Sequence, residues 1–175
     1  MALPDFIDLT QGTPIIWGEA GASGVTNTIG VDALANGSAR MGAAADLGAD
    51  FAERYALYLL VETGTAPTAG LTVDVYLCWS YDNATWPAKV TGSDGAYTLG
   101  TADANLRQAG TPYSLIATND ADTVLVQSPY IITPKSRYVV PILDNNLGQA
   151  IRDETTATDN GTRIILVPIR AKVVD

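Results

Sequence analysis

Two kinds of side chain in this sequence could take part in binding or catalysis: aromatic rings around one polar segment, and a few neighbouring acids. Trp79 and Tyr81 lie just before the polar segment of residues 82–110, Trp86 lies near its start and Tyr97 lies in its middle. Aromatic rings in a polar loop can stack on sugars, or they can pack as a hydrophobic plug that holds the loop on the fold. Both interpretations fit the sequence, and we favour the plug.

Neighbouring acids are the remaining option for catalysis. Asp153 and Glu154 would point to opposite sides of an extended chain, and the segment around them, residues 144–161, has the polar composition of a solvated connection. Hydrolysis of a glycoside needs two carboxyl groups about 5–10 Å apart across a cleft, and adjacent residues do not predict that geometry. Asp120 and Asp122 lack the further ligands of a calcium loop. We therefore predict no catalytic residue and no metal site.

The sequence contains no histidine and a single cysteine, Cys78. A Ser-His-Asp triad, a histidine base and a zinc site of the Cys/His type are therefore excluded within one chain. An intrachain disulfide is excluded as well. We expect Cys78 to be a buried structural thiol, and we predict that the protein is not an enzyme and uses no cofactor.

Charge and hydrophobicity narrow the choice of partner. The net charge is −9, from 10 basic and 19 acidic residues, and no basic run occurs. Nucleic-acid binding needs clustered lysine and arginine, so we expect no nucleic-acid partner. We also see no signal peptide and no apolar run long enough for a membrane span. Only 17% of the residues are charged and 47% are hydrophobic, which is compatible with extensive burial against another protein.

The element that positions the aromatic segment is the stretch 71–81, LTVDVYLCWSY. Val73, Val75 and Leu77 alternate with more polar residues. Because successive side chains of a strand point to opposite faces, this pattern predicts a strand with one apolar face. The apolar stretch 51–62 precedes it, and its Tyr, Leu and Val content favours a second strand that forms a hairpin with the first.

Further β-rich stretches end at Asn, Asp, Gly or Pro residues, as strands between turns do. Proline has no N–H for a ladder, so Pro141 and Pro168 predict strand edges or bulges. In the last stretch Ile165, Val167 and Ile169 share one face, with the basic side chains opposite. The stretches are 13–17, 113–117, 123–127, 130–133, 138–143 and 163–174.

Many short strands without intervening helices predict an all-β fold, an antiparallel β-sandwich of jelly-roll-like type. Residues 1–50 are rich in glycine and alanine. We interpret them as an extended N-terminal arm with a few short strands, packed less deeply than the sandwich domain of residues 51–175.

Several stretches between residues 62 and 169 resemble head decoration (cement) proteins of tailed bacteriophages, a group of small β-sandwich proteins. The N-terminal TPIIWGEAG and GAAADLGA are similar in character to that family. The stretches that carry the resemblance are VDVYLCWS, GSDGAYTLG, NLRQAG, SPYIITPKSRYVVPILDNNLGQAI and RIILVPI.

The resemblance implies a structural virion protein, made in the host cytoplasm, that binds the outer surface of a capsid and stabilises the capsomer lattice. Its partners would be the major capsid protein and further copies of itself. Two other interpretations stay open: a carbohydrate-binding virion module that uses the loop aromatics, and a tail or baseplate component. The candidate docking residues are Trp17, Trp79, Tyr81, Trp86, Tyr97, Arg137 and Tyr138.

Overall fold

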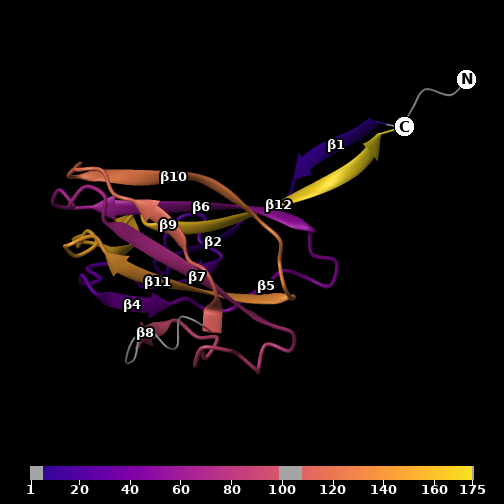
Figure 1. The fold of residues 1–175 in the computed structure, drawn as a ribbon, viewed down its shortest axis with the longest axis horizontal. Helices are drawn as coiled ribbons and strands as arrows, with labels where there is room; N and C mark the ends of the chain where they lie inside the picture. The colour runs from indigo at the N-terminus through magenta and orange to yellow at the C-terminus, as the bar shows by residue number, and fades with distance from the viewer. Residues whose placement is uncertain (1–5, 99–107, 175) are drawn as a thin grey trace, which may run out of the picture.

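Two sheets pack face to face in the computed structural model, which describes residues 6–98 and 108–174 (Figure 1). Almost all strand pairs are antiparallel, and the described residues contain almost no helix. The predicted all-β sandwich is therefore confirmed. No helix in the described part is long and apolar enough to cross a membrane.

The first sheet, sheet A, has the strand order β10-β6-β12-β2-β3, and β1 pairs with the end of β12. Among the strands that the structure describes, only the pair β2–β3 is parallel. The bounds are β1 (Phe6–Gln11), β2 (Ile15–Gly18), β3 (Asn27–Thr28), β6 (Arg54–Thr63), β10 (Thr123–Ile132) and β12 (Arg163–Val174).

The second sheet, sheet B, has the order β8-β4-β11-β7-β9, and β5 pairs with β11. A short 3-10 helix, Ala157–Asp159, lies in the connection before β12. The bounds are β4 (Ser38–Met41), β5 (Ala45–Asp46), β7 (Thr72–Ser80), β8 (Gly95–Tyr97), β9 (Tyr113–Ile116) and β11 (Tyr138–Asn146).

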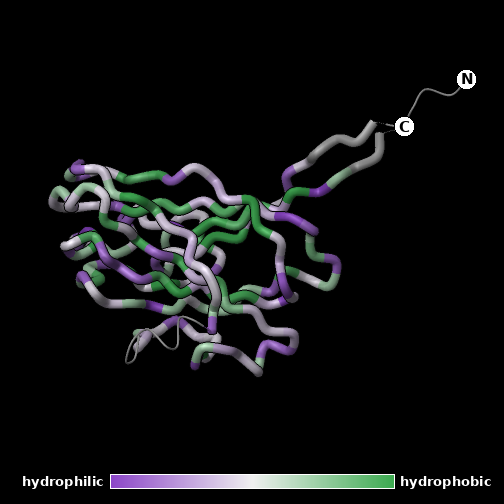
Figure 2. Tube along the Cα trace, in the orientation of Figure 1, coloured by the Kyte–Doolittle hydropathy of each residue, from purple (hydrophilic) through white to green (hydrophobic). Residues whose placement is uncertain are grey.

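The main core lies between the sheets, where the hydrophobic stretches of the chain face each other (Figure 2). Val73, Val75 and Leu77 of β7 are buried there, as their alternation predicts. Leu57 and Leu59 of β6 meet them from sheet A. Each such fully buried side chain contributes about 1.5–3 kcal/mol relative to exposure, so the alternating strands account for much of the stability.

The predicted hairpin between β6 and β7 is wrong, because the two strands lie in different sheets. β6 pairs with β10 and β12, whereas β7 pairs with β11 and β9. Both strands have one strongly apolar face, and placing them in opposite sheets buries these faces against each other. The connection of residues 64–71 is long enough for this, since facing sheets are only about 10 Å apart.

The two strand prolines lie in central strands and not at edges, which corrects that prediction. Each stands opposite a break in the neighbouring strand. Pro141 falls between the parts of β11 that pair with β4 and with β5, and Pro168 falls between the parts of β12 that pair with β1 and with β2. Gly42 and Gly12 donate their N–H groups to the carbonyl oxygens of these prolines. A Cβ at either glycine would come within about 3.0 Å of the proline ring, so glycine makes room for each ring.

Parts of the segment predicted as a loosely packed arm are deeply buried. Trp17, Ile29 and Val31 are fully buried in the main core, so the expectation of shallow packing is wrong for them. β2 and β3 belong to sheet A, and β4 and β5 to sheet B. Only β1 projects from the sandwich. Together with the end of β12 it forms a two-stranded ribbon, residues 6–11 and 169–174, which we name the terminal ribbon (Figure 1).

Candidate binding surface

The polar segment after β7 folds back over the outer face of sheet B and builds a second, smaller hydrophobic core. Ala88, Val90 and Tyr97 from this segment are buried against Cys78 of β7 and against side chains of β4 and β11. The Tyr97 hydroxyl donates a hydrogen bond to the Ala88 carbonyl oxygen at 2.5 Å. The segment is thus held by packing, as the plug interpretation predicts.

The four loop aromatics do not share one surface. Tyr97 is only 7% exposed. Trp86 is half-buried and packs on the second core, whereas Trp79 is half-buried on the other face of β7, against the main core. Tyr81 is the exposed member, at 73%. Because stacking on a sugar needs accessible ring faces side by side, this arrangement offers no sugar-binding platform.

Trp17 is no docking residue either, because its side chain is 0% exposed. Its indole Nε1 donates to the Ala43 carbonyl oxygen at 2.8 Å. The ring therefore ties the segment between β4 and β5 to sheet A from inside the sandwich.

Arg137 and Tyr138 do lie at the surface, where they bind a neighbouring strand. The guanidinium of Arg137 makes two hydrogen bonds of 2.6 Å to the carboxylate of Asp46 and lies 5.0 Å from the centre of the Tyr138 ring. The hydrogen bonds from Arg137 hold the pKa of Asp46 below its usual value. This cluster fastens β5 to the start of β11, and its outer side is accessible to a partner.

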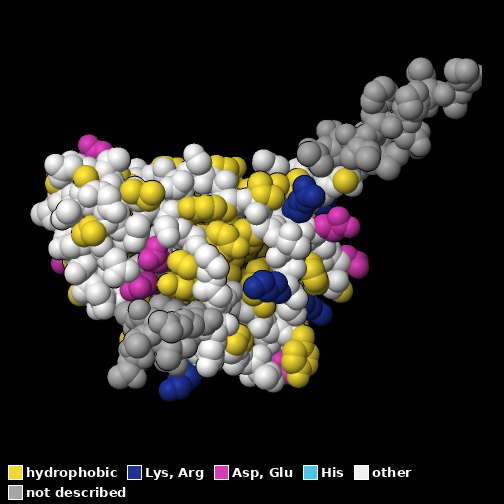
Figure 3. All heavy atoms as spheres, viewed as in Figure 1, with side chains coloured by type: hydrophobic (Ala, Val, Ile, Leu, Met, Phe, Trp, Pro, Cys, Tyr) yellow, Lys and Arg dark blue, Asp and Glu magenta, His cyan; other side chains and the backbone are white. Residues whose placement is uncertain are grey.

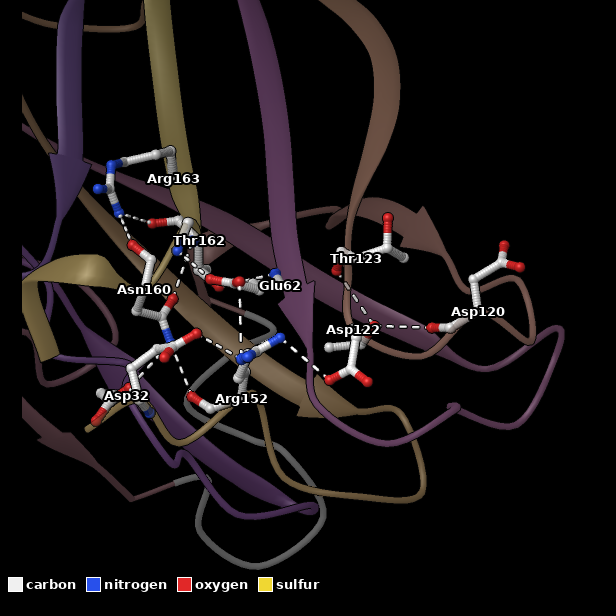
Figure 4. A network of polar contacts seen from close by, with 12 residues as sticks. Asp32, Glu62, Asp120, Asp122, Thr123, Arg152, Asn160, Thr162 and Arg163 are labelled. Carbon is white, nitrogen blue, oxygen red and sulfur yellow. Dashed lines mark hydrogen bonds and ion pairs between the residues drawn. The ribbon is translucent and has the colours of Figure 1, made fainter. Parts of the chain in front are cut away.

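Two of the neighbouring acids of the sequence, Asp122 and Glu154, take part with Glu62 in a network around Arg152 (Figure 4). The Arg152 guanidinium forms an ion pair with Glu154, lies 3.8 Å from a Glu62 oxygen and 3.2 Å from an Asp122 oxygen. Glu62 also accepts a hydrogen bond from the Gly161 N–H. Through Arg152 and Gly161, these carboxylates hold the connection before β12 against the end of β6 and the start of β10. Among the described residues, no group of three His, Cys, Asp or Glu could hold a metal ion.

Asn160 is the buried centre of the same region, at 0% exposure. Its amide nitrogen donates to Asp32 Oδ1 at 3.0 Å and to the Arg152 carbonyl oxygen at 2.8 Å, while its amide oxygen accepts from the Thr162 N–H at 2.9 Å. The interpretation of residues 144–161 as a solvated connection is therefore wrong in part. Leu147 and Ile151 from the same segment are buried in the main core.

The outer face of sheet A carries several apolar side chains that are exposed or half-buried. Val126 and Ile131 are 65% and 60% exposed, and Figure 3 shows hydrophobic side chains at the surface along the edge where β10 and β6 lie. Strand register places Val126 beside Leu60, and Ile165 between Tyr58 and Ile16. We name this surface the bare face; its members are Ile16, Tyr58, Leu60, Val124, Val126, Ile131 and Ile165.

Ile165 and Val167 of β12 share one face, as predicted, but this face is the outer one. The residues of β12 in the main core are Ile164 and Leu166, and Val167 is buried on the outer side, at 8% exposure. Sequence analysis did not single out the bare face, although a signal was present. Both faces of RIILVPI and of YALYLLV are apolar, and a strand that is apolar on both faces is typically covered on both.

Two surface hollows flank the base of the terminal ribbon. One is lined by residues 51–54 and 169–171, and the other by residues 12–15, 45–47 and Pro168. The bare face, these hollows and the ribbon follow one another along β12. Together they form a candidate binding surface.

No protein-family model, curated protein or solved structure matches this chain. The fold therefore defines the class of protein, an all-β sandwich, and the resemblance to phage decoration proteins stays a prediction.

The reactivity of the Cys78 thiol tests whether the segment after β7 packs as a hydrophobic plug over sheet B. Burial raises its pKa to about 12, so we expect it to remain protonated and to react slowly with a disulfide reagent at pH 8 in the native protein. Replacing Trp86 with Ala removes a ring from the cover and should speed the reaction at least about tenfold through local opening. Tyr81→Ala is the control and should leave the rate unchanged. Rapid labelling of the unaltered protein, or equal rates in the two variants, would contradict the packed cover.

Proposed function

We propose that this chain is a structural virion protein that binds the outer surface of a phage capsid and stabilises the capsomer lattice. The observation that carries the proposal is the binding surface itself: an apolar sheet face next to a projecting ribbon, on a rigid two-sheet body. Contiguous apolar surface on a sandwich is typical of sites of protein–protein contact. A cement protein needs such a surface, and it needs a body that does not deform under load.

The ion pairs of the acidic side chains also support a binding role. Several acids are engaged in holding the fold: Glu154 and Asp122 with Arg152, Asp46 with Arg137, and Asp94 with Arg40 at 2.7 Å. The sequence stretches that carry the resemblance to decoration proteins include β7, β11 and β12, the central strands of the sandwich.

The proposal predicts that the purified chain co-sediments with mature heads of the phage that encodes it. Heads and tails separated on a density gradient show where the native protein resides, and recovery in the tail fraction alone would favour the tail or baseplate alternative. Absence from purified virions would exclude both assignments.

A truncated chain tests the role of the terminal ribbon in that binding. Deleting residues 1–11 removes β1, and we expect head binding to weaken at least about tenfold because strand edges and ribbon surface are lost. The sandwich should still unfold cooperatively, since β1 joins sheet A through the end of β12. Wild-type affinity of a folded truncated chain would show that the ribbon does not contribute.

A further inference from the structure

Asparagine is followed by glycine twice in the sequence, at Asn36-Gly37 and at Asn160-Gly161. In such a pair the peptide nitrogen of the glycine can attack the side-chain Cγ of the asparagine. A bond forms between this nitrogen and Cγ, the Cγ–Nδ2 bond breaks, and the amide leaves as ammonia with the proton of the nitrogen. Water then opens the resulting succinimide ring to aspartate or isoaspartate. Because glycine has no side chain to hinder the attack, both pairs can be modified spontaneously in an unfolded chain.

The fold holds the Asn160-Gly161 pair away from this reaction. Ring closure needs a strongly negative ψ at the asparagine, whereas Asn160 has a ψ of 122°. Its amide group is held by Asp32 and by the Thr162 N–H. The attacking nitrogen of Gly161 donates to the Glu62 carboxylate (Figure 4). Rotation toward the reactive geometry would break these hydrogen bonds, so the pair can react only when the connection before β12 opens.

A turn holds the Asn36-Gly37 pair in a similar way. Residues 35–38 are closed by a hydrogen bond of 3.1 Å between the end residues, and Gly37 has a φ of 73°. This is the geometry of a type II turn, in which the residue before the glycine has a ψ near about +120°. The Gly37 N–H donates to the Asn145 carbonyl oxygen at 2.7 Å, and Asn36 Oδ1 accepts from the Gly148 N–H at 2.8 Å. The reactive atoms are therefore engaged here as well.

The two pairs differ in how much of the structure must open. Asn36 is exposed, and the contacts that hold its pair come from one turn, residues 145–148. Asn160 is 0% exposed, and its partners include Asp32 and residues on both sides of it in the connection. A protected group reacts through the open form, so its rate is the rate in the unfolded chain multiplied by the open population. We therefore expect Asn160 to be the better protected of the two.

We propose that Asn36-Gly37 and Asn160-Gly161 are latent deamidation sites that the folded chain holds closed, each through its own local contacts. An aspartate formed at position 160 lies beside the Asp32 carboxylate, where like charges repel. A chain that is modified while unfolded then regains a weaker connection before β12, and unfolding becomes irreversible by chemical change. This inference does not depend on the proposed function.

The test follows both sites in the full-length chain, folded and unfolded in urea, during incubation in a mildly alkaline buffer. Mass spectrometry of proteolytic peptides measures aspartate and isoaspartate at each position separately. Folding should slow the reaction at least about 100-fold at Asn160 and at least about tenfold at Asn36. Equal rates in the folded and the unfolded chain at either position would overturn the proposal.

A change at Glu62 tests the local contact at the second pair. Glu62→Ala removes the acceptor of the Gly161 N–H, and it should speed deamidation at Asn160 at least about tenfold in the folded protein. The rate at Asn36 should not change, and this position serves as an internal control. Glu62→Gln keeps an acceptor oxygen and should restore most of the protection.

Asn145→Ala provides the converse change. The Asn145 side chain holds its own turn through three hydrogen bonds, so its loss should loosen the contacts of Asn36 and leave the rate at Asn160 unchanged. Circular dichroism establishes that the variants are folded. If each variant speeds both sites equally, protection comes from the stability of the whole fold and not from local contacts, and the proposal is overturned.

Discussion

Replacing Trp17 with Ala is expected to lower the free energy of unfolding by about 3–5 kcal/mol. The side chain is fully buried in the main core, so its removal leaves a large cavity between the sheets. The variant also loses the hydrogen bond to the Ala43 carbonyl oxygen. Urea unfolding followed by circular dichroism measures the loss.

Tyr81→Ala serves as the control for that measurement. Its side chain is 73% exposed, and surface substitutions typically change stability by less than about 0.5 kcal/mol. A Trp17→Ala variant as stable as Tyr81→Ala would mean that residues 13–50 pack outside the sandwich, as an arm of the kind that the glycine and alanine content predicts.

Replacing Asn160 with Ala should cost about 2–4 kcal/mol of stability. The change removes three hydrogen bonds, to Asp32 Oδ1, to the Arg152 carbonyl oxygen and from the Thr162 N–H. The first two acceptors keep one donor each, whereas the buried Thr162 N–H loses its acceptor. The connection before β12 should loosen, and hydrogen exchange at residues 152–162 should become faster. Asn27→Ala is the control, since that side chain makes a single hydrogen bond, to Thr26 Oγ1 at 3.1 Å.

The variant Asn160→Asp adds a pH signature to the same prediction. It sets a second carboxylate beside Asp32, which raises the pKa of the new group in the folded state. A raised folded pKa of an acid means that stability is lost as pH rises through it. The variant should therefore lose more stability at pH 7 than at pH 4, relative to the unaltered protein. An equal loss at both pH values would indicate that the two carboxylates do not face each other.

The strands themselves could be predicted from the sequence, because alternation is a local signal. Val73, Val75 and Leu77 are buried as expected, and the late strands begin and end within a few residues of the predicted bounds, apart from the extension of β11 to Asn146. The assignment of strands to sheets was not accessible in this way. Pairing joins residues far apart in sequence, so β6 and β7, adjacent in the chain, were expected to form a hairpin although they face each other across the core.

The candidate surface was missed for a related reason. In the sequence, the aromatic residues were the obvious candidates for a docking site. Trp17 and Tyr97 are buried instead, because large rings stabilise the fold by filling the space between packed layers. The bare face consists of ordinary aliphatic residues such as Val126 and Ile131. Their exposure depends on which strand lies at the edge of sheet A and on where residues 82–98 fold, and neither can be derived from local patterns.

A reconstruction of the phage head by electron cryo-microscopy tests the central claim most directly. We predict density for two packed sheets on the outer surface of the capsid, with the terminal ribbon in contact with another subunit and the bare face of sheet A covered. Heads that carry no such density on their exterior, in virions that contain the protein, would contradict a role as a capsid-binding structural protein.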